Sequence, residues 1–355
     1  MIFRIWRYAY GGAKVMALKS FLLAPGDYHY LLRAKNAEDL VGYLRTTAYG
    51  PTLSGWDWKR ADAEAELSRR LYRNLAQTFL KVRRGFKKRE ASFLDHLVRR
   101  LEVENLKVVL RALHLRLDPL QTEPRLLPLE TLSPLNFPDL LRTGTIPRLV
   151  DTLAPTPWGP PLTRGLPRFT KENNLFPLEM SLDLFVYASL WEGLGKLSRA
   201  DRRIARGLFG TLVDITNITW AGRFRDLYGF PGEEIYQYLI DAGSFSNPAA
   251  RRDLAFAPNT GEMILRLPRQ AYVELLQGAA DRAEVEVRLR QHWMTTLTKN
   301  LAQPPFQIGL PLTFLFFKEL EIDNLITLFT GLVLNLPAEK IAPWLRLRAA
   351  GGAYV

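Results

Sequence analysis

The 355-residue sequence contains no cysteine. Disulfide bonds, thiolate zinc sites, iron–sulfur clusters and cysteine nucleophiles are therefore excluded. Histidine is scarce as well, and none of the four histidines lies in a metal-ligand spacing such as His-Glu-x-x-His: they are His29, His96, His114 and His292. We therefore expect neither a metal site nor a cofactor.

Long apolar runs are also missing. The longest, Ile308 to Phe317, contains Pro311 and stops at Lys318, far short of the ~20 residues that a spanning helix needs. The segment 1–23 does not form the apolar core of a secretory signal, because four cations interrupt it: Arg4, Arg7, Lys14 and Lys19. These features predict a cytoplasmic protein that does not cross a membrane.

The common catalytic motifs are absent. The string nearest to a phosphate-binding loop is Gly193-Leu194-Gly195-Lys196-Leu197, but Leu197 replaces the required hydroxyl and Leu190 replaces the first glycine. A Gly-x-Ser-x-Gly elbow and a glycine-rich dinucleotide fingerprint are missing too. We predict a non-catalytic protein without catalytic residues; an enzyme that uses only carboxylates remains an alternative.

The composition and the apolar pattern of the sequence are instead typical of a helical globular protein. Hydrophobic residues make up 47% and charged residues 24%, which are ordinary values. Apolar residues recur every three or four positions in several long segments, whereas strand-like alternation is hard to find. We therefore predict an all-α fold with helices over 63–86, 94–112, 178–194, 200–228, 271–301 and 313–333.

Two segments interrupt this pattern. The stretch from Pro119 to Pro167 contains eleven prolines, and because proline is excluded from helix interiors we expect short helices and extended connections there. The segment 241–261 is rich in Gly, Ser, Asn and Pro and predicts a second connection. Together with an internal repeat, these breaks predict three helical units: 1–118, 119–240 and 241–355.

The repeat is carried by an acidic residue three positions before an asparagine. Its copies are Glu102 with Asn105, Asp214 with Asn217, and Glu321 with Asn324. Ten positions after each asparagine stands a leucine, at Leu115, Leu227 or Leu334, and a proline follows soon after. An upstream box also repeats, because Asn36 to Leu40 resembles Asn136 to Leu140; a third copy near Leu267-Pro268 is weak. Near-equal spacing of the three main copies indicates triplication.

The acid and the asparagine of each copy share one helix face, because they are three residues apart. Apolar neighbours place that face toward the interior. One interpretation is a buried, hydrogen-bonded pair that fixes how helices pack within each unit. The alternative is a polar wall of a central cavity that receives a partner. We favour the first.

Positive charge dominates the sequence, with a net charge of +12. The densest run contains Lys81, Arg83, Arg84, Lys87, Lys88 and Arg89. Such a run is commonly a solvated helix end. It also suits docking to an acidic protein or to lipid headgroups, and a free-standing basic helical protein that binds nucleic acid is the competing hypothesis.

Taken together, the motifs resemble the C subunit (AC39 family) of V/A-type rotary ATPases and ATP synthases, the homologue of the eukaryotic V-ATPase d subunit. The three acid-x-x-Asn segments are similar to the repeated helices of that family. Further similar boxes are Tyr8 to Ser20, Thr47-Ala48-Tyr49-Gly50, Leu178-Glu179 with Leu182-Asp183 and Tyr187, and Leu336 to Ile341. The sequence departs from the family at Thr330-Gly331-Leu332 and at Thr216.

This resemblance implies three similar helical subdomains arranged as a pseudo-threefold funnel. It implies a non-catalytic central-rotor subunit, peripheral on the cytoplasmic side of the membrane, that transmits torque between ATP chemistry and ion flow. The implied partners are the proteolipid rotor ring (c/L subunits), beneath the wide end of the funnel, and central-stalk subunits of the D and F type, in its cavity. Neither a cofactor nor nucleic acid is implied.

Overall fold

The computed structural model describes residues 2–60 and 62–347, and this part of the chain is helical without strands, which confirms the all-α prediction. The long helices are α1 (Ile2–Lys19), α4 (Ala63–Arg83), α5 (Lys88–Leu115), α10 (Phe176–Gly193), α11 (Arg199–Asp226), α16 (Arg282–Leu301) and α17 (Gly309–Val333). Shorter α-helices are α2 (Pro25–Leu31), α3 (Ala37–Arg45), α6 (Pro119–Thr122), α7 (Phe137–Leu141), α8 (Ile146–Leu153), α9 (Gly159–Glu172), α12 (Gly232–Tyr238), α13 (Pro248–Ala255), α14 (Thr260–Leu265), α15 (Gln270–Leu276) and α18 (Ala338–Ile341). Short 3-10 turns are η1 (Pro51–Leu53), η2 (Glu123–Arg125), η3 (Leu194–Lys196), η4 (Gly243–Ser246) and η5 (Ala342–Trp344).

Five of the six predicted helices correspond to single helices, α4, α5, α10, α11 and α17. The predicted helix 271–301 is wrong, because the chain breaks between α15 and α16. Gly278 has a φ of +76°, a left-handed conformation that ends a helix and favours glycine. Asp281 then starts α16 by accepting a hydrogen bond from the Glu284 N–H, as an N-cap residue does.

The proline-rich segment mostly forms short helices, as predicted, but α9 is an exception. This 14-residue helix has Pro160 and Pro161 near its start, where proline is tolerated, and Pro167 in its interior. The prediction that every proline here is barred from a helix interior is therefore wrong for Pro167. Packing of α9 along α10 compensates for the backbone hydrogen bond that the proline ring removes.

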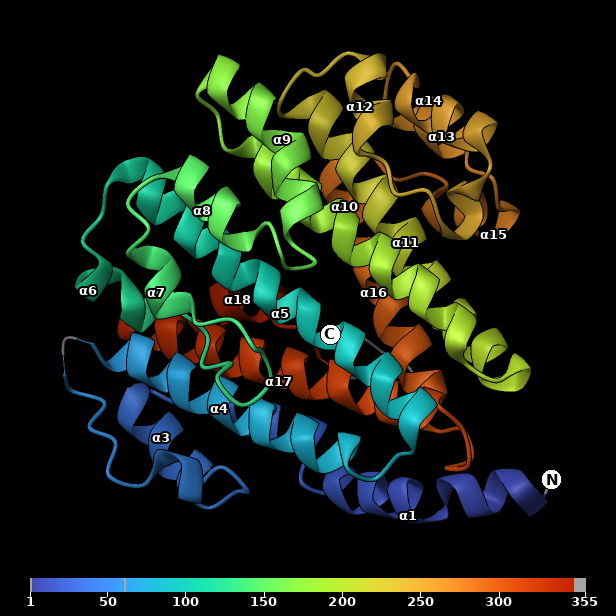
Figure 1. Cartoon of the computed structure of the whole chain (residues 1–355). Coiled ribbons are helices and arrows are strands. Elements are labelled where there is room, and N and C mark those ends of the chain that lie inside the picture. Colours follow the sequence, from blue (N-terminus) through green and yellow to red (C-terminus); the bar gives the residue numbers. More distant parts are fainter. Residues whose placement is uncertain (1, 61, 348–355) are drawn as a thin grey trace.

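The long helices α5, α11 and α17 start close together and then diverge (Figure 1). Near their starts, the Asp201 carboxylate at the head of α11 accepts a hydrogen bond of 3.4 Å from the N–H of Ile308, just before α17. Phe209 of α11 contacts both Phe93 of α5, with 5.6 Å between ring centroids, and Phe316 of α17, with 5.9 Å. We call the end with the turns 84–88, 194–199 and 302–309 the closed end, and the end with residues 111–117, 223–228 and 327–336 the open end.

Helix α1 lies across the closed end, where two glycines permit backbone-to-backbone contact. A Cβ atom on Gly11 would stand 2.5 Å from the carbonyl oxygen of Gly85, in the turn between α4 and α5. A Cβ atom on Gly12 would stand 2.6 Å from the carbonyl oxygen of Pro305, in the loop before α17. Side chains are excluded at both positions, so the glycines fix which face of α1 points away from the protein.

Candidate functional site

The three repeat asparagines make the same pair of hydrogen bonds, each with the backbone of one residue further along the chain. Their side-chain amides donate to the carbonyl oxygens at 2.9, 3.0 and 3.0 Å, and their side-chain oxygens accept from the N–H groups at 2.7, 2.8 and 2.8 Å. The pairs are Asn105 with Leu127, Asn217 with Ile240, and Asn324 with Arg346. All three asparagines are buried, which favours the packing interpretation over a partner-facing role.

The repeat acids are buried as well and bind the short helical segments between the long helices. Glu321 accepts from the N–H of Leu23 at 2.6 Å and from the hydroxyl of Tyr49 at 2.7 Å. Asp214 accepts from the N–H and the hydroxyl of Ser244, both at 2.7 Å. The remaining acid, Glu102, accepts from the hydroxyl of Ser133.

A buried aromatic side chain completes each acid site, and the sequence analysis missed all three. Tyr49 bonds Glu321, Trp158 bonds Glu102, and Tyr272 bonds Asp214. Two of them follow a threonine in the same local turn, because the N–H of Tyr49 and of Trp158 each donates to the hydroxyl of the threonine two residues before it, at 3.2 Å. The Thr-x-aromatic spacing was therefore an available signal.

These bonds connect the units in a closed circle. The acid of α5 binds the segment that follows α5, and the acid of α11 binds the segment that follows α11. The acid of α17 binds residues 23 and 49, at the other end of the sequence. The predicted unit boundaries remain a prediction, but the N-terminal short helices pack with the last long helix.

The upstream box is an N-cap in every copy. Asn36, Asn136 and Asn259 each accept a hydrogen bond from the backbone N–H three residues later, at the heads of α3, α7 and α14. The third copy was expected near Leu267-Pro268, which is wrong. In the third copy Glu262 stands where the other two copies have aspartate, and either acid stabilises a helix start.

A central cavity lies between α4, α5, α10, α11, α16 and α17. It consists of three adjoining pockets of about 260, 420 and 460 Å³ that share Asp323 and Arg346 as wall residues. At the closed end the aromatic contacts of Phe209 and Phe316 obstruct it, whereas Arg111 and Thr327 extend its wall to the open end. The cavity wall therefore reaches the open end.

Charged side chains dominate the cavity wall. Arg100 forms two contacts of 3.2 and 3.4 Å with Glu319 across the gap between α5 and α17, and Tyr72 donates to Asp323 at 2.9 Å. Glu104 and Asp323 stand directly before a repeat asparagine and line the cavity, as do Arg223 and its ion-pair partner Glu286. Among the repeat asparagines, only Asn105 borders it. The wall therefore comes mainly from positions that the sequence analysis did not select.

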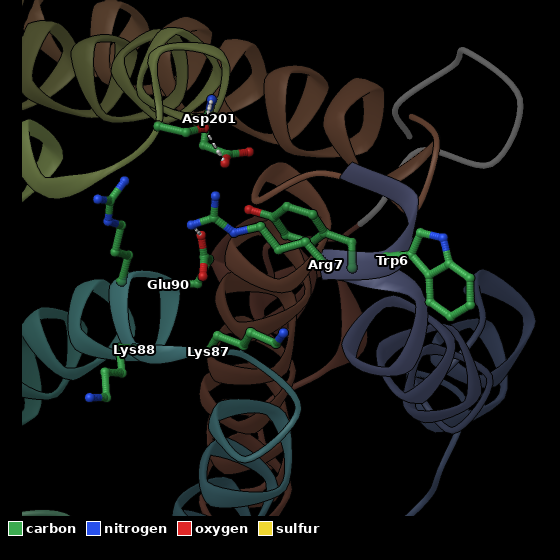
Figure 2. Close-up of a pocket in the computed structure, with 9 residues that line it drawn as sticks. Trp6, Arg7, Lys87, Lys88, Glu90 and Asp201 are labelled. Atoms are coloured by element: carbon green, nitrogen blue, oxygen red, sulfur yellow. Dashed lines mark hydrogen bonds and ion pairs between the residues drawn. The ribbon is translucent and has the colours of Figure 1, made fainter. Parts of the chain in front are cut away.

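The predicted basic surface spans the end of α4, the following turn and the start of α5. Arg83 is paired with Asp95, whereas Lys87, Lys88 and Arg89 line a cavity of about 970 Å³ at the closed end, together with Trp6 of α1 (Figure 2). Its other wall residues are Arg7, Tyr8, Glu90, Ser198 and Asp201. Arg7 forms an ion pair with the buried Glu90, and Lys81 and Arg84 are outside the wall.

The repeated leucines are exposed at the open end. Each of them occupies the same position in its copy of the repeat, ten residues after the asparagine. Their exposed fractions are similar: 64% for Leu115, 59% for Leu227 and 63% for Leu334. Other large apolar side chains are exposed beside them: Leu117, Leu120, Tyr228, Val333 and Leu336. Clusters of exposed apolar side chains are typical of contact surfaces. We call the exposed apolar residues at the open end the apolar rim.

A family model for the ATP synthase (C/AC39) subunit matches residues 12–343. The chain belongs to this family. Similar proteins include the C subunit of the A-type ATP synthase of Methanocaldococcus jannaschii, 23% identical over 348 residues that cover 96% of this chain and 86% of that protein. The proteins of the same name from Archaeoglobus fulgidus and Thermococcus gammatolerans are 26% and 24% identical, over 95% and 94% of this chain and 94% and 88% of theirs. The resemblance seen in the sequence is thereby confirmed.

Two further features bear on this C/AC39 family member. Within residues 2–60 and 62–347, no helix combines the length and the apolar character needed to span a membrane. In the same part of the chain, no group of three or more His, Asp or Glu side chains is arranged to hold a metal ion.

The cavity carboxyl of Asp323 predicts a pH-dependent stability. Burial and then the nearby Glu319 raise its pKa from the ordinary value of 3.8 to about 6. The folded state therefore holds the proton more tightly than the unfolded state, so this stabilisation is present below about pH 4 and is lost as the pH rises through about 6. The neutral variant Asp323→Asn should be more stable than the wild type at about pH 8, and the difference should vanish at about pH 4.

The expected gain is small, because the Asp323 side chain is 37% exposed and solvent screens it; we expect about 1 kcal/mol or less. Denaturant titrations at both pH values measure it. Asp253→Asn, at an exposed position of α13, is the control and should change nothing at either pH. An Asp323→Asn protein that is less stable than the wild type at pH 8 would refute this assignment.

Proposed function

We propose that this protein is a non-catalytic central-rotor subunit of a rotary ATPase, which joins the central stalk to the proteolipid ring and transmits torque between them. Family membership supports the rotary complex, since similar proteins are named as the C subunit of A-type ATP synthases. The observation that carries the socket role is the central cavity, which six long helices surround and whose wall reaches the open end. The nucleic-acid hypothesis explains neither the cavity nor the repeat.

In this proposal the stalk tip enters the cavity at the open end. The apolar rim with Leu115, Leu227 and Leu334 would surround the inserted stalk, and the charged pairs, such as Arg100 with Glu319, would set its orientation. Charged side chains commonly contribute specificity and orientation at interfaces, whereas apolar side chains contribute more of the affinity.

In this proposal the proteolipid ring contacts the opposite, closed end of the protein. The resemblance implied instead that the wide end of the funnel faces the ring. We place the ring at the closed end because the cavity wall reaches the open end, which the stalk occupies in this proposal. The closed end carries α1 and the basic residues Lys87, Lys88 and Arg89. Such a surface suits a peripheral position on the cytoplasmic side of a membrane, where anionic lipids attract cations.

An obstruction of the cavity tests the proposal. Thr219 of α11 lines the cavity, so Thr219→Arg adds a long charged side chain where the stalk would insert. We expect stalk binding to weaken at least tenfold, which corresponds to about 1.4 kcal/mol, while binding to the ring is retained. Titration of the full-length chain with purified stalk subunits measures the affinity.

Gly207→Arg is the matched control, because it introduces the same residue on the same helix. Gly207 is exposed, and a Cβ atom there meets no other atom within 4 Å. Its stalk affinity should equal that of the wild type. Equal binding by Thr219→Arg, with an unchanged melting temperature, would eliminate the cavity as the stalk site.

A further inference from the structure

Helix α1 has an outward face without a single charged residue. Every third or fourth residue from position 6 to 21 is exposed, which is the spacing of one continuous helix face. These residues, the α1 stripe, are Trp6, Ala9, Tyr10, Ala13, Met16 and Ala17 of α1, with Ser20 and Phe21 in the turn that follows it. Exposed helix faces of globular proteins are usually polar, so this face is unusual.

The large side chains of the α1 stripe are far from buried. Trp6 is 77% and Tyr10 is 68% exposed. A rotation of α1 about its axis would turn both side chains toward the interior. The backbone contacts of Gly11 and Gly12 with residues 85 and 305 prevent that rotation. The protein therefore presents a row of apolar side chains toward the outside.

Cations border the α1 stripe. The sequence of α1 contains four cations and no acid, and the half-buried Arg7 and Lys14 adjoin the stripe. Across the 970 Å³ cavity from Trp6 lie Lys87 and Lys88 (Figure 2). The two acids of that cavity are turned inward: Glu90 pairs with Arg7 and Asp201 bonds the N–H of Ile308.

We propose that the α1 stripe lies in the interfacial region of an anionic lipid bilayer. An apolar helix face with Trp and Tyr, flanked by Lys and Arg, is the pattern of helices that lie in the membrane plane. A bilayer surface supplies both counterparts, anionic headgroups for the cations and an apolar layer beneath them. A protein partner would need an apolar groove ringed by acids to match the same surface.

This inference deepens the proposed function, because it names what the closed end contacts besides the ring. It can still fail separately. Lipid binding is measured on the isolated full-length chain with protein-free vesicles, whereas ring and stalk binding are measured in detergent without vesicles.

The test is co-flotation of the protein with phosphatidylcholine vesicles, with and without phosphatidylglycerol. The wild type should float only with the anionic vesicles, and added salt should release it, because exposed charges are screened within about 10 Å at 0.1 M salt. The double variant Trp6→Ser/Tyr10→Ser should bind at least tenfold more weakly, since it removes most of the apolar surface available for insertion. Lys14→Gln/Lys88→Gln should weaken binding several-fold.

Two matched controls identify the surface. Trp344→Ser removes a tryptophan that is 71% exposed but lies in η5, and Lys171→Gln removes an exposed cation of α9; both should float like the wild type. All variants should keep the wild-type melting temperature. The proposal is overturned if the wild type does not bind anionic vesicles, if Trp6→Ser/Tyr10→Ser binds as well as the wild type, or if that variant loses only ring binding in detergent.

Discussion

Replacing Glu321 by leucine should cost about 3–5 kcal/mol of unfolding free energy, the typical loss when one partner of a buried ion pair is removed. Glu321 lies 3.3 Å from the ammonium of Lys318, and both side chains are buried. The leucine would leave this charge without a counterion and the N–H of Leu23 without its acceptor. It would also remove the acceptor of Tyr49, so the N-terminal segment should detach from α17 first.

Denaturant titration followed by circular dichroism measures this loss. The double variant Lys318→Met/Glu321→Leu should recover the part of the loss that comes from the unpaired charge, because it leaves no buried charge, although the N–H of Leu23 still lacks its acceptor. Glu339→Leu, at an exposed position of α18, should change stability by no more than about 0.5 kcal/mol. If Glu321→Leu loses less than about 1 kcal/mol, the third acid site does not hold the termini of the fold together.

The second large effect is expected for Asn217→Leu. Asn217 is fully buried, and leucine can satisfy neither the carbonyl oxygen nor the N–H group of Ile240. Two buried backbone groups at about 1–3 kcal/mol each predict a loss of about 2–6 kcal/mol. Asn105→Leu and Asn324→Leu should act in the same direction, because both make the same pair of bonds.

The same proteins distinguish the two interpretations of the asparagines. Gln237→Leu, at an exposed amide of α12, is the control for replacing an amide by leucine and should be neutral. Refolded Asn217→Leu should still bind the stalk subunits under conditions where it is folded. Unchanged stability together with lost stalk binding would place the asparagines in the interface and reject their packing role.

Local sequence patterns predicted the long helices well because apolar residues recur at helical spacing along them. The exceptions have local causes: Gly278 and Asp281 interrupt an apolar pattern that alone suggests one helix from 271 to 301. Pro167 is tolerated because α9 packs along α10. The apolar periodicity shows neither the break at Gly278, which depends on backbone conformation, nor the tolerance of Pro167, which depends on tertiary packing.

The candidate sites were predicted less completely. The repeat identified Asn105, Asn217 and Asn324, but their partners are backbone groups in irregular segments, which leave no side-chain signal. The partner of Glu321, Tyr49, is at the opposite end of the chain. The cavity residue Asp323 stands directly beside the repeat asparagine Asn324. Helix α17 packs on several sides, and a sequence pattern that follows one buried stripe does not show that Asp323 lies on a second face, which lines the cavity.

The most direct measurement of the central claim is cross-linking within the assembled complex. The chain has no cysteine of its own, so each introduced cysteine is a unique attachment point. Thr327→Cys lies in the cavity wall at the open end, and Gly195→Cys lies in the turn before α11 at the closed end, where a Cβ atom has space. A socket that joins stalk and ring through opposite ends predicts that Thr327→Cys cross-links to the central stalk and Gly195→Cys to the proteolipid ring. Cross-links from both cysteines to one partner, or the reverse assignment, would contradict it.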